Sequence, residues 1–320
     1  MTQSEGMLRS TAYKLKIFFK QICSISVIDS HLFIYILGCK IRKKLKTTPK
    51  TVSVNTFGLN TDTRETRIIA SLTSFPQRIG YVHNTISTLL SQTVKPDVLV
   101  LWLASEQFPN KEQDLPDTLL RLKEFGLTIA WCEDLRSYKK LIPALKEYPE
   151  DIIITFDDDI YYPQNTIELL YNSYKQEPQS IHTNRARKLY LKNNELYSCS
   201  LGETMWGNNQ KSSYLNKITG CGGVLYPPHS LNDLVFDENL FKALIPTQDD
   251  VWFWAMAVLN HTKIKIAANY NIQLITVDDT QDVGLSKINA RNNTGMDSLD
   301  ASRLIAREFS EIIEIIKESK

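Results

Sequence analysis

Residues 151–159 read DIIITFDDD, an apolar run that ends in three aspartates. The apolar, β-branched run 151–156 predicts a buried strand, and three carboxylates follow where that strand ends. Adjacent carboxylates repel one another, and a hard divalent cation such as Mn²⁺ or Mg²⁺ relieves the repulsion. Because Mg²⁺ completes its shell with waters and substrate phosphates, the stretch predicts a metal site for a diphosphate. The alternative is an acidic strand end that leads into a helix at Pro163.

Strand-like and helix-like segments alternate on both sides of this stretch. The expected strands are 68–73, 98–103, 127–131 and 151–156, and the expected helices lie around 82–90, 116–125 and 139–148. This alternation predicts an α/β fold with a mostly parallel central sheet flanked by helices. The second half is less regular, with a strand-like 180–183 and expected helices at 248–259 and 298–316.

Composition excludes some classes of protein. The chain has 320 residues, 42% of them hydrophobic, which is enough for a sizeable core. Its 37 basic and 36 acidic residues give a formal charge of +1, without the basic excess of a nucleic-acid-binding protein. The five cysteines are scattered and contain no C-x-x-C pair, so neither a disulfide framework nor a zinc site is expected. A cytoplasmic location fits this cysteine usage.

The chain is expected to begin with a basic helical segment, 1–46, whose longest apolar run is far shorter than the roughly 20 residues that span a bilayer. Flanking lysines suggest peripheral contact with an anionic membrane surface, and the alternative is an ordinary packed N-terminal helix. A polar linker is expected at 47–66, followed by the main domain at 67–300 and a C-terminal helix at 301–320.

Three motifs carry a family resemblance. These are the D-x-D sequence in FDDDIYYP, the preceding SLTSFPQRI, and LLSQTVKPDVLVLWLASEQFP between them. Together they resemble the GT-A-fold glycosyltransferases, in particular bacterial transferases related to family two. The resemblance implies a Rossmann-like nucleotide-binding half at 67–160 and an acceptor-binding half at 161–300.

The implied activity is metal-dependent transfer of a sugar from a nucleoside-diphosphate sugar, expected to be a UDP-sugar, to a hydroxyl of a glycan or glycolipid. The implied setting is synthesis of surface polysaccharide or lipopolysaccharide at the inner face of a bacterial membrane. The implied donor-binding residues are Thr73, Ser74, Arg78, Asp134, Lys139, Asp157 and Asp158, and the implied metal ligands are Asp159 and Asp157. For Lys139 the alternative is a solvated lysine at a helix start.

A second acidic cluster, Asp249 and Asp250, precedes the apolar run VWFW. The resemblance implies that one of the two is the base that takes the proton from the acceptor hydroxyl. The alternative is helix capping, because Thr247 and Asp250 have the spacing of a capping box. Capping explains only one aspartate, so both remain candidates, with Asp250 preferred.

The glycine-rich stretch 220–223 permits close approach of the backbone to a ligand, and the resemblance places Gly222 and Gly223 beside the donor sugar and acceptor. A plain turn into a strand is the alternative. Trp206 is a candidate for stacking on a sugar ring, whereas a tryptophan at helix spacing is typical of a core. His229 and His261 are weaker candidates for a third metal ligand. The polar loop 287–297 suits a lid over the donor phosphates or an exposed turn.

Two rival functions use parts of the same pattern. A metal-dependent phosphohydrolase would also use paired aspartates, but no phosphoryl-transfer signature accompanies them. A non-catalytic nucleotide- or carbohydrate-binding protein of the same fold would not need the second acidic cluster.

Overall fold

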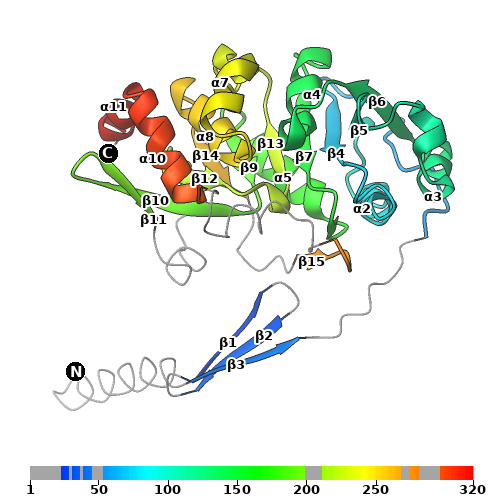
Figure 1. Ribbon diagram of the computed structural model, residues 1–320, viewed down its shortest axis with the longest axis horizontal. Helices are drawn as coiled ribbons and strands as arrows, with labels where there is room; N and C mark the ends of the chain where they lie inside the picture. The colour runs from blue at the N-terminus through cyan, green and yellow to red at the C-terminus, as the bar shows by residue number, and fades with distance from the viewer. Residues whose placement is uncertain are drawn as a thin grey trace, which may run out of the picture. The chain divides into compact units, whose positions relative to one another are not determined.

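The computed structural model describes residues 23–28, 31–36, 39–44, 53–198, 211–267, 274–280 and 296–319. It divides into two units: Met1–Lys50 with Gln273–Thr276, and Thr51–Ile272 with Val277–Lys320. Figure 1 shows the elements of both. Among the described residues, no helix has the length and apolar character needed to cross a bilayer.

The smaller unit contains three strands where a helix was expected. β1 (Cys23–Ile28), β2 (His31–Ile36) and β3 (Cys39–Lys44) form an antiparallel sheet in that order. The expectation of a helix in this part of the segment 1–46 was wrong. The physical reason lies in the sequence: CSISVI and HLFIYI are rich in β-branched and aromatic residues, and two residues separate successive strands, which is a hairpin spacing.

The larger unit is built on a seven-stranded sheet in the order β14-β9-β13-β7-β4-β5-β6. Its strands are β4 (Ile68–Thr73), β5 (Val98–Ala104), β6 (Leu127–Cys132), β7 (Ile152–Phe156), β9 (Ile181–Thr183), β13 (Val224–Tyr226) and β14 (Ile264–Ile266). β13 runs antiparallel to β7 and β9, and the other neighbouring strands are parallel. The α/β fold with a mostly parallel central sheet is therefore confirmed.

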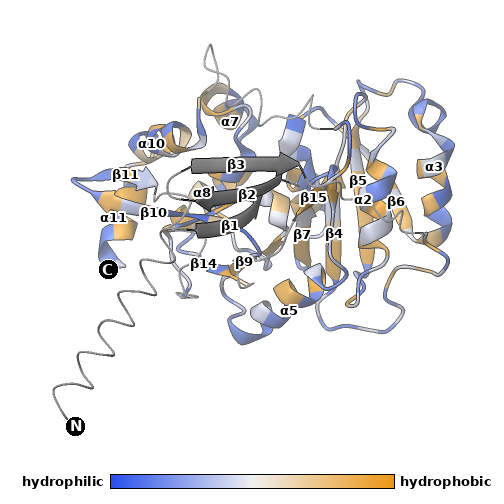
Figure 2. Cartoon of the chain, turned by 90° about the horizontal axis from the view of Figure 1, so that it is seen from below, coloured by the Kyte–Doolittle hydropathy of each residue, from blue (hydrophilic) through white to orange (hydrophobic). Residues whose placement is uncertain are grey.

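Helices cover the sheet, whose apolar strands are the orange arrows of Figure 2. The helices of the larger unit are α2 (Val82–Leu89), α3 (Asp117–Leu120), α4 (Ile142–Glu147), α5 (Thr166–Gln176), α7 (Glu238–Leu244), α8 (Asp249–Leu259), α10 (Ser298–Glu308) and α11 (Glu311–Glu318). Short 3-10 turns lie at η1 (Lys111–Asp114), η2 (Arg121–Phe125), η3 (Arg136–Lys140), η4 (Gly220–Gly222) and η5 (Asp233–Phe236). The single helix expected at the C-terminus is two helices, separated at Phe309 and Ser310.

Helix α8 lies in the main core. Its residues from Val251 to Val258 are fully buried, and α10 and α11 pack against it. The indole nitrogens of Trp252 and Trp254 donate to the backbone oxygens of Val235 and Tyr214. These contacts fix the direction of α8 and thus the backbone from which the acidic pair projects.

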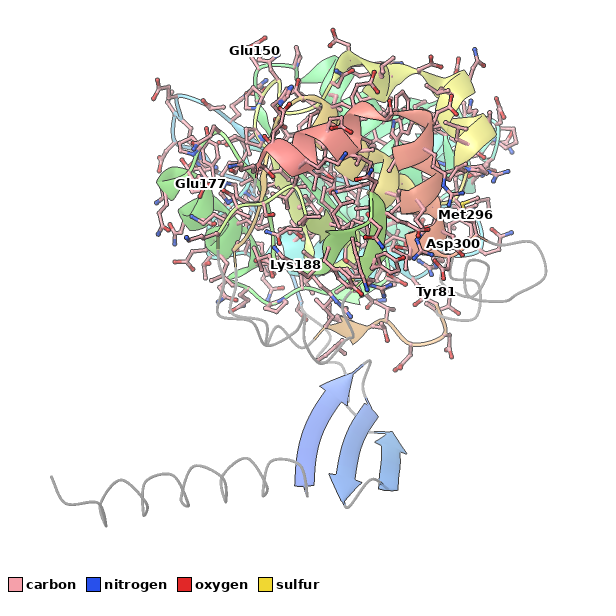
Figure 3. All side chains as sticks on the ribbon, turned by 90° about the vertical axis from the view of Figure 1, so that its left-hand side faces the viewer. Tyr81, Glu150, Glu177, Lys188, Met296 and Asp300 are labelled. Atoms are coloured by element: carbon pink, nitrogen blue, oxygen red, sulfur yellow. The ribbon has the colours of Figure 1, made fainter. Side chains whose placement is uncertain are left out.

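A second, smaller antiparallel sheet has the order β11-β10-β12. Its strands are β10 (Ala186–Lys192), β11 (Glu195–Ser198) and β12 (Asn216–Ile218). Two further short strands are β8 (Ile160–Tyr161) and β15 (Ile275–Thr276). Figure 3 shows the side chains of the larger unit, with Lys188 of β10 and with Met296 and Asp300 on either side of the α10 start. The chain passes from the end of β12 directly into η4, which carries the glycine-rich stretch.

Part of the expected linker packs on the larger unit. The side chains of Asn60 and Arg64 both bind the Asp97 carboxylate, at 2.6 and 2.8 Å. The backbone N–H of Gly58 donates to the oxygen of Phe125. The expected domain boundary at residue 67 is therefore too late, because polar residues without apolar periodicity are held here by hydrogen bonds rather than by core packing.

The strand order reverses direction beside β4. β5 and β6 are added in sequence on one side of β4, and β7 lies on its other side. In open parallel sheets, ligands bind at such a switch point, beyond the carboxyl ends of the strands. Leu72 is opposite Phe156 in the β4–β7 pairing, so the residues that follow these two strands emerge side by side.

Candidate functional site

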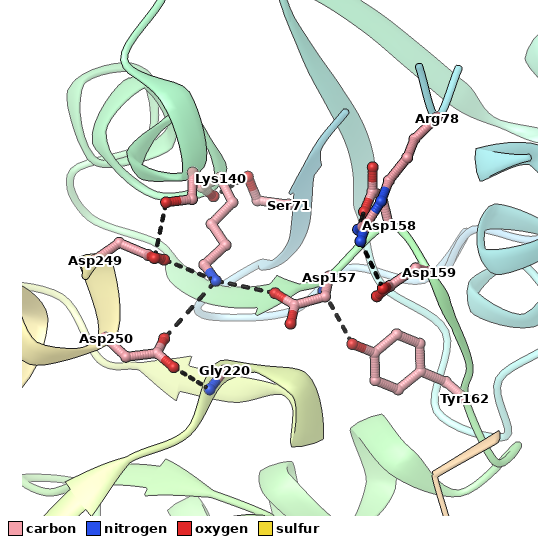
Figure 4. A network of polar contacts seen from close by, with 11 residues as sticks. Ser71, Arg78, Lys140, Asp157, Asp158, Asp159, Tyr162, Gly220, Asp249 and Asp250 are labelled. Carbon is pink, nitrogen blue, oxygen red and sulfur yellow. Dashed lines mark hydrogen bonds and ion pairs between the residues drawn. The ribbon is translucent and has the colours of Figure 1, made fainter. Parts of the chain in front are cut away.

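The acidic triplet lies at this switch point, and its three members have different partners. The backbone N–H of Asp157 donates to the hydroxyl oxygen of Tyr162 at 2.9 Å, and the side chain of Asp157 is 30% exposed. Asp158 and Asp159 face Arg78, and their side chains are only 7% and 12% exposed. The triplet therefore presents one accessible carboxylate and two that the protein partly neutralises (Figure 4).

Arg78 is the internal counter-charge for two of the carboxylates. Its guanidinium lies 2.6 Å from Asp158 and 3.1 Å from Asp159, and the Ser74 hydroxyl donates to the other oxygen of Asp158 at 2.6 Å. Burial opposes the charge on Arg78, but the adjacent carboxylates outweigh that effect and raise its pKa. Both oxygens of Asp158 are thus bound by protein donors, which favours a structural part for Asp158 rather than the donor contact that the resemblance implies.

Lys140 joins the triplet to the second acidic cluster. Its ammonium lies 2.9 Å from Asp157, 2.8 Å from Asp249 and 3.8 Å from Asp250. Burial opposes the charge on Lys140, yet these three carboxylates raise its pKa well above the ordinary value. Sequence reasoning selected the adjacent Lys139 instead. In the 3-10 turn η3, neighbouring side chains point about 120° apart, so only a structure identifies which lysine faces the site.

The two aspartates at the start of α8 differ in their surroundings. Asp249 accepts a hydrogen bond from the Ser137 hydroxyl at 2.8 Å and forms an ion pair with Lys140, and its side chain is 9% exposed. Asp250 accepts from the Gly220 N–H at 2.9 Å, and its side chain is 31% exposed. Loss of hydration is the main reason that the pKa of Asp250 is raised to about 6, and Lys140 counteracts part of this effect. Asp250 is therefore the more accessible carboxylate of the pair, and its raised pKa makes it a stronger base than an ordinary aspartate.

Gly220 is the glycine nearest to these carboxylates. A Cβ atom at position 220 would lie 2.7 Å from an Asp250 carboxylate oxygen and 2.9 Å from the Lys140 ammonium. Gly222 and Gly223, the predicted ligand contacts, instead lie against protein. A Cβ at 222 would meet Arg185 at 2.8 Å, and Gly223 has a φ of +83° and lies over the Phe156 ring. Packing therefore accounts for both glycines.

Lys139 and Asp134 pair with each other at the end of β6, at 2.5 Å. Gln107 donates to the second oxygen of Asp134 at 2.8 Å, and the backbone N–H of Arg136 donates to the first. Burial tends to raise the pKa of Asp134, but its donors outweigh that effect and lower it. Lys139 is thus engaged with a carboxylate on the β6 side of the sheet.

Of the remaining candidate site residues, some lie in the described part of the chain and some do not. The Thr73 hydroxyl donates to the backbone oxygen of Trp102 at 2.8 Å, which holds β4 to β5. His229 is mostly exposed and contacts Glu150 at 3.1 Å, not the triplet. His261 is also exposed, in a turn after α8. Trp206 and residues 287–295 of the expected lid lie outside the described residues.

The carboxylates present have the right chemistry for a hard divalent ion. Mg²⁺ and Mn²⁺ take oxygen ligands, and Mg²⁺ is commonly held by one or two carboxylates with the rest of its shell from water and phosphate. Asp157 is accessible, and Asp159 lies two residues further along the same strand end. Within the described residues, no group of three or more His, Cys, Asp or Glu side chains gathers as a preformed metal cage. The donor set therefore fits a metal shared with a phosphate ligand.

No protein-family model matches the sequence, and no curated protein matches it. Solved structures resemble it distantly. The inositol-1-phosphate CTP transferase from T. maritima is 10% identical with a TM-score of 0.41, covering 80% of this chain and 98% of that chain. A mannosyltransferase from Pyrobaculum calidifontis, in complex with GDP-Man and Mn²⁺, is 11% identical with a TM-score of 0.45, covering 82% of this chain and 76% of that chain. Both likenesses are too distant to assign this chain a ligand or a reaction.

Proposed function

We propose that this protein is a metal-dependent glycosyltransferase that moves a sugar from a nucleoside-diphosphate sugar, with a UDP-sugar as the expected donor, to a hydroxyl of a glycan or glycolipid. The expected pathway is synthesis of surface polysaccharide or lipopolysaccharide. The expected location is the cytoplasm, with peripheral contact at an anionic membrane.

One observation carries the proposal. Two acidic clusters that are about 90 residues apart in sequence converge on one ammonium group at the switch point of a parallel sheet. Sugar transfer needs a site for a diphosphate leaving group and a carboxylate that accepts a proton from the acceptor. Asp157 with Asp159 supports the first requirement, and Asp250 supports the second.

The proposed roles follow from accessibility and hydrogen bonding. Asp250 accepts the proton of the acceptor hydroxyl, because it is the more exposed member of its pair and its pKa is raised above that of an ordinary aspartate. Asp249 holds its place through Ser137 and Lys140. Arg78 and Ser74 hold Asp158 next to the proposed diphosphate site. In this proposal Asp134 contacts the base or sugar of the donor and Lys139 contacts its diphosphate.

Asp157 and Asp159 would hold the divalent ion, which supplies positive charge to the departing diphosphate. The chain's own contribution is to fix the end of β7 through the hydrogen bond from the Asp157 backbone N–H to the Tyr162 hydroxyl, and to hold the Asp159 carboxylate through its ion pair with Arg78.

The first experiment is thermal unfolding of the purified protein with a panel of nucleoside diphosphates, each with and without Mn²⁺. A ligand that binds only the folded state raises the melting temperature, so one diphosphate is expected to give a Mn²⁺-dependent increase. Asp159→Ala is expected to abolish that increase and the slow release of nucleotide from the matching sugar nucleotide.

The rival functions give different results in the same assays. A phosphohydrolase would release inorganic phosphate from simple esters, and a binding protein would show the shift in melting temperature but release no nucleotide. No shift with any nucleoside diphosphate, or full activity of Asp159→Ala, would remove the proposal.

A further inference from the structure

Lys140 is a buried charge that the proposed chemistry does not require to touch a substrate. Its residue is 6% exposed, and its ammonium lies among three carboxylates from two separate elements. Burying an ammonium group is costly unless it is paired and hydrogen-bonded. The three surrounding carboxylates therefore compensate the cost of burying the Lys140 ammonium.

The backbone of Lys140 is fixed to the sheet on the side away from the carboxylates. The Ser71 hydroxyl of β4 donates to the Lys140 backbone oxygen at 2.7 Å, and the indole nitrogen of Trp102 on β5 donates to the same hydroxyl at 3.1 Å. The ammonium thus projects from an anchored turn into the space between β7 and α8 (Figure 4). A lysine that is anchored at its base can hold two movable carboxylates at a set separation.

We propose that Lys140 is a positioning residue that clamps Asp157 at the end of β7 to Asp249 at the start of α8, and thereby directs the neighbouring Asp250 at the acceptor side of the site. The proposal rests on the glycosyltransferase function proposed above.

The distances from the Lys140 ammonium to the three carboxylates support this proposal. Lys140 makes close ion pairs with Asp157 and Asp249, at 2.9 and 2.8 Å, but lies 3.8 Å from Asp250. The close contacts hold the donor-side carboxylate and the first residue of α8, and the longer one leaves the Asp250 carboxylate available. Gly220 completes the arrangement by donating its N–H to the other oxygen of the Asp250 carboxylate.

The first test measures the clamp without any substrate. In a double-mutant cycle with Lys140→Met and Asp249→Asn, each single change breaks the same ion pair, so their effects on folding should not add. We expect a coupling of at least about tenfold in the folding equilibrium constant. Additive effects would overturn the clamp, whatever reaction the protein catalyses.

The second test separates positioning from charge balance. The double variant Lys140→Met/Asp249→Asn loses one cation and one anion, so the formal charge of the cluster is unchanged. It should recover most of the stability that Lys140→Met loses, but its turnover of the sugar nucleotide should stay at least about 100-fold below the wild type. The affinity for the nucleoside diphosphate in the presence of Mn²⁺ should fall by a smaller factor than turnover, because Asp159 and Arg78 are unchanged.

The matched control is Lys217→Met, since Lys217 is an equally buried lysine that donates to the backbone and hydroxyl oxygens of Ser298 rather than to the acidic clusters. This variant should keep wild-type turnover. Recovery of both stability and turnover in the double variant would reduce Lys140 to a structural counter-charge and overturn the proposal. Absence of nucleotide binding in the wild-type protein would instead refute the glycosyltransferase function, and the folding cycle would still decide the clamp.

Discussion

Arg78→Met should destabilise the protein strongly, because it removes the partner of a buried carboxylate. The side chains of Arg78 and Asp158 are 10% and 7% exposed, and their contact is 2.6 Å. Breaking a buried ion pair by removing one partner costs about 3–5 kcal/mol, because the remaining charge stays buried and uncompensated. Met retains most of the apolar volume, so the loss reports mainly on charge.

A second arginine provides the matched comparison. Arg67 pairs with Asp151 at 2.5 Å, but the Arg67 side chain is 53% exposed. Water compensates much of such a pair, so Arg67→Met should cost about 1 kcal/mol or less. Urea unfolding, followed by the fluorescence of the buried Trp252 and Trp254, measures both losses on the same unit.

Two further measurements test the electrostatic explanation. Burial raises the pKa of Asp158 even with Arg78 present, so without Arg78 the carboxyl should be protonated more readily. The cost of Arg78→Met should therefore be larger at pH 8 than at pH 5, and adding Asp158→Asn should recover most of it. Mn²⁺ should stabilise Arg78→Met more than the wild type. If Arg78→Met costs no more than Arg67→Met at both pH values, the buried-pair reasoning is wrong.

Three more variants probe the acceptor side and a buried lysine. Asp250→Asn should lower the rate of sugar transfer by at least about 100-fold. The folded-state pKa of Asp250 is about 6, above the ordinary 3.8, so the variant should be more stable than the wild type above pH 6 but not below pH 4. Thermal unfolding across this pH range measures the difference. Gly220→Ala should displace Asp250 and Lys140 and reduce turnover about tenfold or more, while circular dichroism stays native; unchanged turnover would mean that the two side chains adjust freely. Burial lowers the pKa of Lys217 to about 7, below its ordinary 10.5, so wild-type stability from this group rises between pH 7 and 10.5. The stability gained by Lys217→Met should accordingly be larger at pH 6.5 than at pH 9.5, and a gain that is equal at both would contradict the lowered pKa.

The sequence was sufficient for β4, β5, β6, β7 and β9 of the main sheet and for the position of both acidic clusters, whereas β14 was not predicted. The expected strand 68–73 matches β4, and 127–131 matches β6 within one residue. Continuous β-branched runs bounded by polar residues leave little choice of structure, and the carboxyl ends of parallel strands share one edge. The convergence of residues that follow β4 and β7 was therefore predictable.

The partners of the acidic residues were not predictable in the same way. Arg78 was expected to contact the donor, but it binds Asp158 and Asp159, which are 80 residues away in the chain. Lys139 and Lys140 are indistinguishable by type and position in the sequence. Their different partners follow from the direction in which each side chain leaves the 3-10 turn η3 and from the contact of Ser71 with the Lys140 backbone. Both are features of the tertiary structure.

The N-terminal segment shows a different limit of sequence reasoning. Its flanking lysines led to the prediction of a basic helical segment at a membrane surface. The β-branched and aromatic residues between the lysines instead favour strands. In a short segment without clear helical periodicity, strand propensity and two-residue loops were the stronger signal. Contact of this segment with a membrane stays a prediction.

The charge balance of the site connects the metal to the donor. Among the described residues, five carboxylates of the site form ion pairs with Arg78 and Lys140: Asp157, Asp158, Asp159, Asp249 and Asp250. These seven residues together carry a formal charge of −3 when all are ionised. A nucleoside diphosphate is itself anionic, so it should bind weakly to this site alone. A divalent cation should strengthen its binding at least about tenfold, and by linkage the nucleotide should strengthen cation binding equally. Calorimetric titration with UDP, with and without Mn²⁺ and corrected for complex formation in solution, measures this coupling. Equal affinity in both titrations would mean that Arg78 and Lys140 suffice as counter-charges, and that the triplet does not act through a metal.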